Sequence, residues 1–260
     1  MKKILSVLLV SILLIGCEER VLFEDLIKKG ENYYFESKLF NGIMFDIYDD
    51  GQLKFEEKYK DGKMNGLSKG WYFNGKLKYE ANFKDGKKDG LAKNWYENGQ
   101  LKFEESFKDD TKDGLDKNWH ENGQLKHQIN YKDGKKVGSW KGWYKNGQLE
   151  REISYKNGSR AGLDKHWYEN GKLESVWSYK NDKRDGFFEG WYKNGQLKYQ
   201  INYKDGKKVG SWKGWYKNGS LAKEFFYLKN GQSVEIYNSG EHAKDLFPDP
   251  YYRFSFISVS

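Results

Sequence analysis

Cysteine and proline are nearly absent from this chain of 260 residues. The single cysteine, Cys17, excludes an intramolecular disulfide. The two prolines, Pro248 and Pro250, lie near residue 260, and proline cannot donate to a β-ladder, so the remainder suits an uninterrupted sheet. Hydrophobic residues make up only 37%, which alone suggests disorder. Aromatic residues at 18% indicate a folded protein instead, because their side chains bury large areas.

Long apolar runs are also scarce, and the one near the N-terminus, residues 4–15, is too short to span a bilayer. It follows Lys2 and Lys3, as in a secretory signal peptide. The segment Leu14-Ile15-Gly16-Cys17 resembles the lipobox of bacterial lipoproteins, in which the cysteine after the cleavage site carries the lipid. The resemblance implies a signal peptide at residues 1–16, lipidation of Cys17 and a membrane anchor in the cell envelope, with inner and outer membrane both open. The alternative is an ordinary signal peptide with an incidental cysteine.

Seven tryptophans recur every 24 residues at the start of the phrase Trp-Tyr-x-Asn-Gly-x-Leu, with small departures. They are Trp71, Trp95, Trp119, Trp143, Trp167, Trp191 and Trp215. A fixed period of this length predicts a repeat array. Turn signals such as Asn74-Gly75 and Asp85-Gly86 enclose aromatic-rich runs of strand length, so each unit should form a β-hairpin.

The predicted fold is all-β, an elongated antiparallel β-sheet array of 24-residue hairpin repeats. About eight units should occupy residues 42–240. Residues 17–41 should hold the lipid anchor, a linker and an N-terminal cap, with a degenerate hairpin near residues 26–35. Residues 241–260 should form a tail or capping strand, since the terminal units of an open sheet are expected to be atypical.

Alternation predicts that one strand of each unit has a buried face carrying Leu77, Tyr79 and Phe83. The face of the tryptophans depends on the turn. A two-residue Asn-Gly loop places Trp71 on the polar face. A three-residue loop with a left-handed glycine pairs Trp71 with Leu77, and we favour it because Leu67 then joins the same apolar face. This choice also brings lysines onto that face and sets Lys141 opposite Arg151.

The sequence contains little that is typical of a catalytic or metal-binding site. The sequence has no phosphate-binding glycine loop, no His-Glu-x-x-His motif and no cysteine pair. Three of the four histidines, His120, His127 and His166, replace residues at regular repeat positions. Residues 109–114 faintly resemble a calcium loop, but His120 stands where such a loop needs a glutamate, so a turn is the better interpretation. We expect no catalytic residue, no metal and no cofactor.

Lysine-rich turns form the first candidate binding surface, because they should all project from one edge of the sheet. The residues concerned are Lys87, Lys88, Lys135, Lys136, Lys183, Arg184, Lys207 and Lys208. A basic edge attracts anionic lipid, lipopolysaccharide, nucleic acid or an acidic protein. The favoured alternative is that these lysines keep a long sheet soluble and block edge pairing. Nucleic acid is not expected as a partner because the chain should be exported.

The tryptophan column is the second candidate surface. At about 10 Å spacing, two strand separations, such a column could stack on sugar rings or peptidoglycan. The favoured alternative is that the tryptophans simply form the core of a chain with few aliphatic residues.

The phrase Gly-x4-Trp-Tyr-x-Asn-Gly-x-Leu, followed by Tyr-Lys-Asp-Gly-Lys, is similar to the MORN repeat variant of bacterial proteins identified as YwqK-family antitoxins. The resemblance covers about residues 42–240. It implies a binding role rather than catalysis. The leading hypothesis is a lipid-anchored, antitoxin or immunity-like protein that binds a protein toxin. The alternative is an envelope scaffold or a surface lipoprotein that binds glycan or cell wall.

Overall fold

The computed structural model describes residues 18–228 and 231–238. The expected signal peptide, Cys17 and the expected tail at 241–260 lie outside the described residues. The chain divides into two compact units, residues 1–114 and 115–260, and each is considered by itself. Both consist of antiparallel hairpins, which confirms the predicted all-β class of 24-residue repeats.

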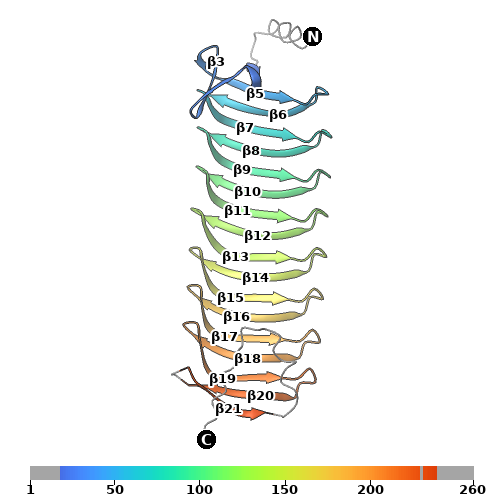
Figure 1. Ribbon diagram of the computed structural model, residues 1–260, viewed down its shortest axis with the longest axis vertical. Helices are drawn as coiled ribbons and strands as arrows, with labels where there is room; N and C mark the ends of the chain where they lie inside the picture. The colour runs from blue at the N-terminus through green and yellow to red at the C-terminus, as the bar shows by residue number, and fades with distance from the viewer. Residues whose placement is uncertain (1–17, 229–230, 239–260) are drawn as a thin grey trace. The chain divides into compact units, whose positions relative to one another are not determined.

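The first unit has a main sheet and a small sheet (Figure 1). In the main sheet β5 to β10 pair antiparallel in chain order, and β1 pairs parallel with β5. The small sheet joins β2, β3 and β4. The elements are β1 (Arg20–Leu22), the 3-10 helix η2 (Phe23–Asp25), β2 (Ile27–Lys29), β3 (Asn32–Phe35), β4 (Lys38–Leu39), β5 (Gly42–Ile47), β6 (Leu53–Lys60), β7 (Lys63–Trp71), β8 (Leu77–Lys84), β9 (Lys87–Trp95) and β10 (Leu101–Lys108).

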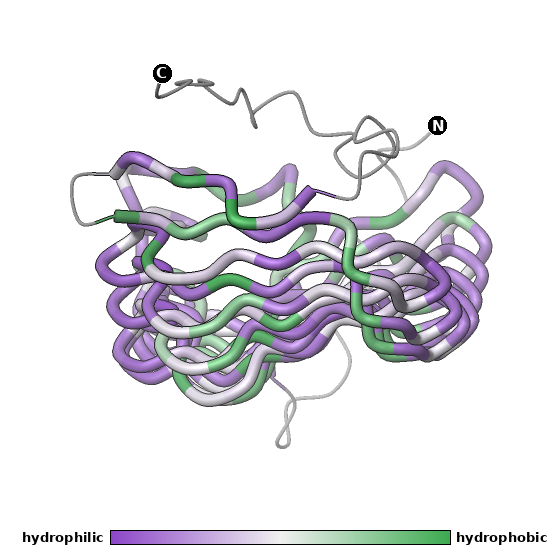
Figure 2. The backbone as a smooth tube through the Cα atoms, turned by 90° about the horizontal axis from the view of Figure 1, so that it is seen from below, coloured by the Kyte–Doolittle hydropathy of each residue, from purple (hydrophilic) through white to green (hydrophobic). Residues whose placement is uncertain are grey.

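The second unit continues the same hairpin pattern, and the division between the units falls within β11 (Thr111–Trp119). Strands β12 to β21 pair antiparallel, each with the next along the chain. They are β12 (Leu125–Lys132), β13 (Lys135–Trp143), β14 (Leu149–Lys156), β15 (Ser159–Trp167), β16 (Leu173–Lys180), β17 (Lys183–Trp191), β18 (Leu197–Lys204), β19 (Lys207–Trp215), β20 (Leu221–Tyr227) and β21 (Ser233–Asn238). In Figure 2 the strands curve, and the turns at both of their ends are mostly hydrophilic.

The Asn-Gly turns close three-residue loops, as favoured from the sequence. The Gly75 N–H donates to the carbonyl of Tyr72 (2.9 Å), and the Tyr72 N–H donates to the carbonyl of Lys76 (2.8 Å). Gly75 has a φ of 77°, a left-handed conformation that glycine adopts without steric cost. Trp71 therefore pairs with Leu77.

A β-bulge follows each of these turns and changes which side chains share a face. Trp71 pairs with Leu77, but Gly70 pairs with Tyr79, so Lys78 is one extra residue. The side-chain period of a strand is two, so one extra residue reverses the faces. Leu77 and Trp71 consequently lie on the face opposite to Tyr79. The same shift recurs in the second unit.

The two faces of each sheet therefore differ from the predicted ones. The face that carries Ser68, Ala81 and their equivalents is called the aromatic face, because the Tyr and Phe columns lie on it. The opposite face, which carries Lys69, Glu80 and their equivalents, is called the lysine face. Ser68 pairs with Ala81 and Lys69 with Glu80, while Leu67 pairs with the polar Asn82 and is 37% exposed. The expectation that Leu77 shares a buried face with Tyr79 and Phe83 is wrong, because the bulge reverses the register. Leu67, Trp71 and Leu77 do share one face, as predicted, and it is the lysine face.

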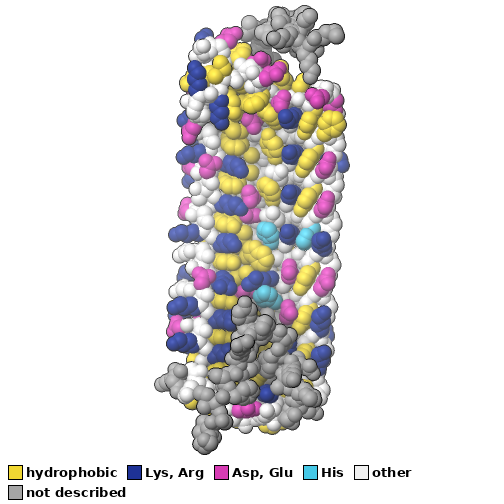
Figure 3. Space-filling model, in the orientation of Figure 1, with side chains coloured by type: hydrophobic (Ala, Val, Ile, Leu, Met, Phe, Trp, Pro, Cys, Tyr) yellow, Lys and Arg dark blue, Asp and Glu magenta, His cyan; other side chains and the backbone are white. Residues whose placement is uncertain are grey.

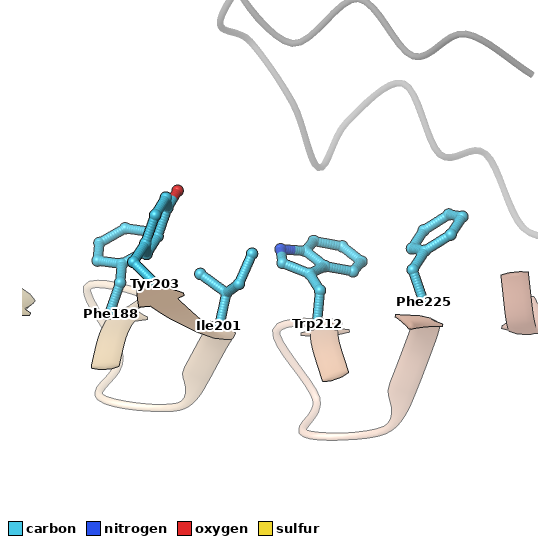
Figure 4. Close-up of a cluster of buried hydrophobic side chains, with 5 residues drawn as sticks. All are labelled: Phe188, Ile201, Tyr203, Trp212 and Phe225. Carbon is cyan, nitrogen blue, oxygen red and sulfur yellow. The ribbon is translucent and has the colours of Figure 1, made fainter. Parts of the chain in front are cut away.

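The most buried side chains form columns on the aromatic face. In the second unit the cluster consists of Phe188, Ile201, Tyr203, Trp212 and Phe225, whose side chains rise from neighbouring strands to the same side (Figure 4). In the first unit Ser68 and Ala81 occupy the equivalent column and are also buried. Each of the seven periodic tryptophans is only half-buried. The core thus depends on a column whose residue type varies between repeats.

The start of the first unit is closed by its own small elements. Ile27 pairs with Tyr34 in the hairpin of β2 and β3, as predicted for this segment. Phe40 and Met44 are each 1% exposed and cluster with Val21 of β1. The edge strand β5 is therefore covered by a parallel strand and an apolar cluster, which protects an otherwise open sheet edge.

Candidate binding surfaces

Hydrogen bonds from tyrosines of the Trp-Tyr pairs join consecutive repeats within each unit. Tyr72 donates its hydroxyl to the carbonyl of Trp95 at 2.7 Å, a residue 23 positions later. In the second unit Tyr144 donates in the same way to the carbonyl of Trp167 at 2.7 Å. His120 takes the place of such a tyrosine, and its Nε2 lies 3.1 Å from the carbonyl of Trp143. These constant residues hold the array together, and His120 has a structural partner.

Half of the predicted basic residues lie on aromatic rings. The Nζ atom of Lys88 is 5.0 Å from the ring centre of Phe107, and the guanidinium carbon of Arg184 is 4.1 Å from that of Trp177. Lys136 and Lys208 lie in the same way over Tyr155 and Tyr227, at 5.3 and 5.2 Å. Burial, with the nearby charge of Arg184, lowers the pKa of Lys208. Figure 3 shows Lys and Arg side chains beside hydrophobic ones on the face in view. Cation–π packing of this kind supports the fold.

The other half of the predicted residues face the opposite way and are exposed. Each begins a strand on the lysine face and pairs directly with the exposed lysine that ends the preceding strand. These five pairs are named the lysine ladder: Lys60 with Lys63 and Lys84 with Lys87 in the first unit, and Lys132 with Lys135, Lys180 with Lys183 and Lys204 with Lys207 in the second. Like charges directly opposite one another destabilise a sheet.

A neighbouring column on the same face has the opposite arrangement. Lys69 and Glu80 pair across β7 and β8 with 3.5 Å between Nζ and Oε2. Lys141 faces Glu152 at 3.4 Å, so the expectation that Lys141 opposes Arg151 is wrong. Arg151 pairs with Gly142 instead, because the bulge shifts the register. Within each unit, therefore, one column pairs lysine with glutamate, whereas the ladder pairs lysine with lysine.

Acidic groups offset the ladder only locally. Lys204 forms an ion pair with Asp185 at 3.0 Å, and this hydrogen bond, with one from the Asp205 N–H, lowers the pKa of Asp185. The turns themselves contain aspartates with positive φ, such as Asp85 and Asp133. Each of these turns contains two ladder lysines but only one aspartate, so the turn has a net positive charge.

The second unit also contains a buried ion cluster on its aromatic face. Arg151 donates to both carboxylate oxygens of Asp164, from Nε at 2.9 Å and from Nη2 at 2.7 Å. His166 Nε2 lies 3.0 Å from the same carboxylate, whose side chain is 2% exposed. Burial by itself raises the pKa of Asp164, but the hydrogen bonds from Arg151 and His166 outweigh burial and hold it at about 2. This arrangement satisfies the buried charge, so His166 is a structural group.

Other expected features have plain structural roles. In the segment 109–114, the carboxylate of Asp110 accepts a hydrogen bond from the Lys88 N–H at 2.7 Å, as a turn residue does. No group of three or more His, Cys, Asp or Glu suited to a metal occurs among residues 18–228 and 231–238. The same part of the chain contains no helix with the length and apolarity of a membrane span.

The basic turns could be located from the sequence, but the face of the sheet on which each basic side chain lies was not predicted. Lys87, Lys135, Lys183 and Lys207 join the ladder, and their neighbours Lys88, Lys136, Arg184 and Lys208 do not. A signal was present, because alternation within a strand places consecutive residues on opposite faces. The contact between Arg151 and Asp164 could not be predicted in this way, because the bulge sets the register that brings the two side chains together.

Comparison with known families gives one result. Eight segments, together more than half of the chain, match the model described as MORN repeat variant. They are residues 40–61, 64–85, 88–109, 112–133, 136–157, 162–181, 184–205 and 208–230. The curated proteins yield no match.

Proposed function

From the premise that the chain belongs to the MORN repeat variant family, we propose that it is a non-enzymatic protein that binds a protein partner. The ladder pairs of a single unit form the surface that holds this partner, and the complementary surface of the partner is acidic. A binding role agrees with a repeat fold in which the positions that recur in every repeat maintain the fold itself.

The observation that supports this proposal is the like-charge pairing of the ladder. Lys84 and Lys87 are both exposed and face one another across a turn. Solubility alone does not require this arrangement, because Lys69 and Glu80 keep the same face charged with opposite signs. Lysine pairs that lower the stability of the sheet have a use if a ligand of opposite charge binds them. A positive surface of this kind also speeds the association of an acidic ligand.

The more specific part of the proposal concerns the partner and the location. The partner is a protein toxin, and the chain acts as an antitoxin or immunity-like protein in the cell envelope. A lipid on Cys17 holds it at the membrane, where it meets a toxin that acts in the envelope. Cys17→Ala tests this part, because the variant should leave the membrane fraction, and retention there would rule out the lipid anchor.

A capture experiment tests the surface. Immobilised wild-type protein and the variant Lys84→Glu/Lys87→Glu are each incubated with envelope extracts. In the variant the two paired side chains are both negative, so the pair stays like-charged but its sign is reversed. Lys126→Glu/Lys145→Glu makes the same charge change at exposed positions outside the ladder. A protein partner should be retained by the wild type and the control, lost from the ladder variant, and released by salt. Equal retention by all three would exclude the ladder as the binding surface.

A second candidate function is supported by the tryptophan column. Each periodic tryptophan is half-buried, so part of each residue is exposed, and within each unit the tryptophans recur every 24 residues. A periodic surface suits a periodic ligand such as a glycan of the cell wall, which would make the protein an envelope scaffold. Co-sedimentation with purified peptidoglycan separates the two functions: binding that survives Lys84→Glu/Lys87→Glu but is lost in Trp95→Ala would favour the glycan.

A further inference from the structure

The last strand of the second unit is exposed along its whole length. All six residues of β21 are exposed, and Val234, Ile236 and Tyr237 are 50%, 58% and 44% exposed. β21 pairs with β20 and, among residues 18–228 and 231–238, with no second strand. An open, apolar strand edge is a template for pairing with another strand, so soluble proteins protect such edges.

The first unit shows how this chain protects an edge. Its strand β5 is paired in parallel by the short β1, with Val21 opposite Met44. Phe40 and Met44 complete a buried apolar cluster at that edge. A short segment from outside the repeats therefore suffices as a cap, and β21 lacks an equivalent among the described residues.

We propose that residues 251–259 of this chain cover the exposed edge of β21. Their sequence is Tyr-Tyr-Arg-Phe-Ser-Phe-Ile-Ser-Val, which is rich in aromatic and β-branched residues. Tyr252, Phe254 and Phe256 alternate with Arg253 and Ser255, which is the pattern of a strand with one apolar face.

The connection between the two segments is long enough. Twelve residues, 239–250, separate β21 from Tyr251 and include Pro248 and Pro250. Fully extended, they reach about 40 Å, whereas a six-residue strand is about 20 Å long. The segment can therefore return to either end of β21. The prolines stand just before it, where they do not remove a donor from the new ladder.

Other occupants of the edge are a second copy of this chain and a strand of another protein. The covalent connection favours the chain's own segment, because a tethered strand is present at millimolar effective concentration. This inference does not depend on the proposed partner, since β21 carries no residue of the lysine ladder.

Hydrogen exchange in the full chain tests the inference. The amides of β21 that point away from β20 should exchange slowly in the wild type at low micromolar concentration. In Phe254→Asp/Phe256→Asp they should exchange at least about tenfold faster. The control Arg253→Gln/Ser255→Asp makes the same change of net charge on the opposite face of the segment and should keep most of the protection. Light scattering on the same samples reports the mass.

Three results would overturn the inference. Fast exchange in the wild type would show an uncovered edge. Equal protection in the wild type and in Phe254→Asp/Phe256→Asp would show that another segment covers it. Protection that rises with protein concentration, together with the mass of a dimer, would assign the edge to a second copy.

Discussion

Protonation of Asp164 should destabilise the second unit, because the buried cluster with Arg151 and His166 requires a carboxylate. The carboxyl group has a pKa of about 2 in the folded protein and an ordinary value of 3.8. A difference of this size corresponds to about 2 kcal/mol of folding free energy. The folded pKa is the lower one, so this contribution is complete above about pH 5 and is lost as the pH falls toward 2.

Urea unfolding monitored by tryptophan fluorescence measures this contribution. The free energy of unfolding is compared between the wild type and Asp164→Asn at pH 6 and at steps down to pH 2. Other carboxylates titrate in both proteins, so the difference between the two isolates Asp164. We expect that difference to shrink by about 2 kcal/mol between pH 6 and pH 2.

A difference that stays constant across this range would refute the reasoning, because it would mean that Asp164 has the same pKa folded and unfolded. Arg151→Met provides the control. Without the guanidinium, burial is no longer outweighed and the folded pKa of Asp164 should rise. In Arg151→Met, the part of the acid-induced loss of stability that comes from Asp164 should therefore disappear.

Two further predictions concern the repeat framework. Tyr144→Phe removes the hydroxyl donated to the carbonyl of Trp167 and should lower the free energy of unfolding by about 1 kcal/mol in urea titrations; an unchanged value would show that water replaces the bond at no cost. Gly70→Ala should cost about 1–3 kcal/mol, because a Cβ there would overlap the ring of Tyr79. Thermal unfolding of Gly70→Ala/Tyr79→Ala checks the cause: the two losses should be less than additive, and full additivity would contradict it.

The sequence was sufficient to predict the hairpins, their turns and the pairing of Trp71 with Leu77. These features depend on local chemistry, because Gly75 adopts a left-handed conformation in the turn and the apolar positions repeat with a fixed period. The bulge at Lys78 was not predictable in the same way, since nothing in an alternating strand marks the extra residue. One unrecognised residue was enough to place Leu77 wrongly on the face of Tyr79.

The same bulge explains why the surfaces were only partly predicted. The basic turns were evident, but the division between Lys87, which is exposed, and Lys88, which packs on Phe107, depends on the pairing register. The bonding of Arg151 to Asp164 depends on it as well. The bulge also places Trp71 on the lysine face, whereas the buried column of Ser68 and Ala81 lies on the aromatic face.

The free energy of unfolding of Lys84→Glu tests most directly whether the lysine ladder is maintained for binding at the expense of stability. The substitution replaces a like-charged pair with Lys87 by an opposite-charged one. Stability in low-salt urea titrations should rise by about 0.5 kcal/mol, and the gain should diminish in high salt. An unchanged or lower stability would contradict the account, because the lysines would then already be stabilising where they are.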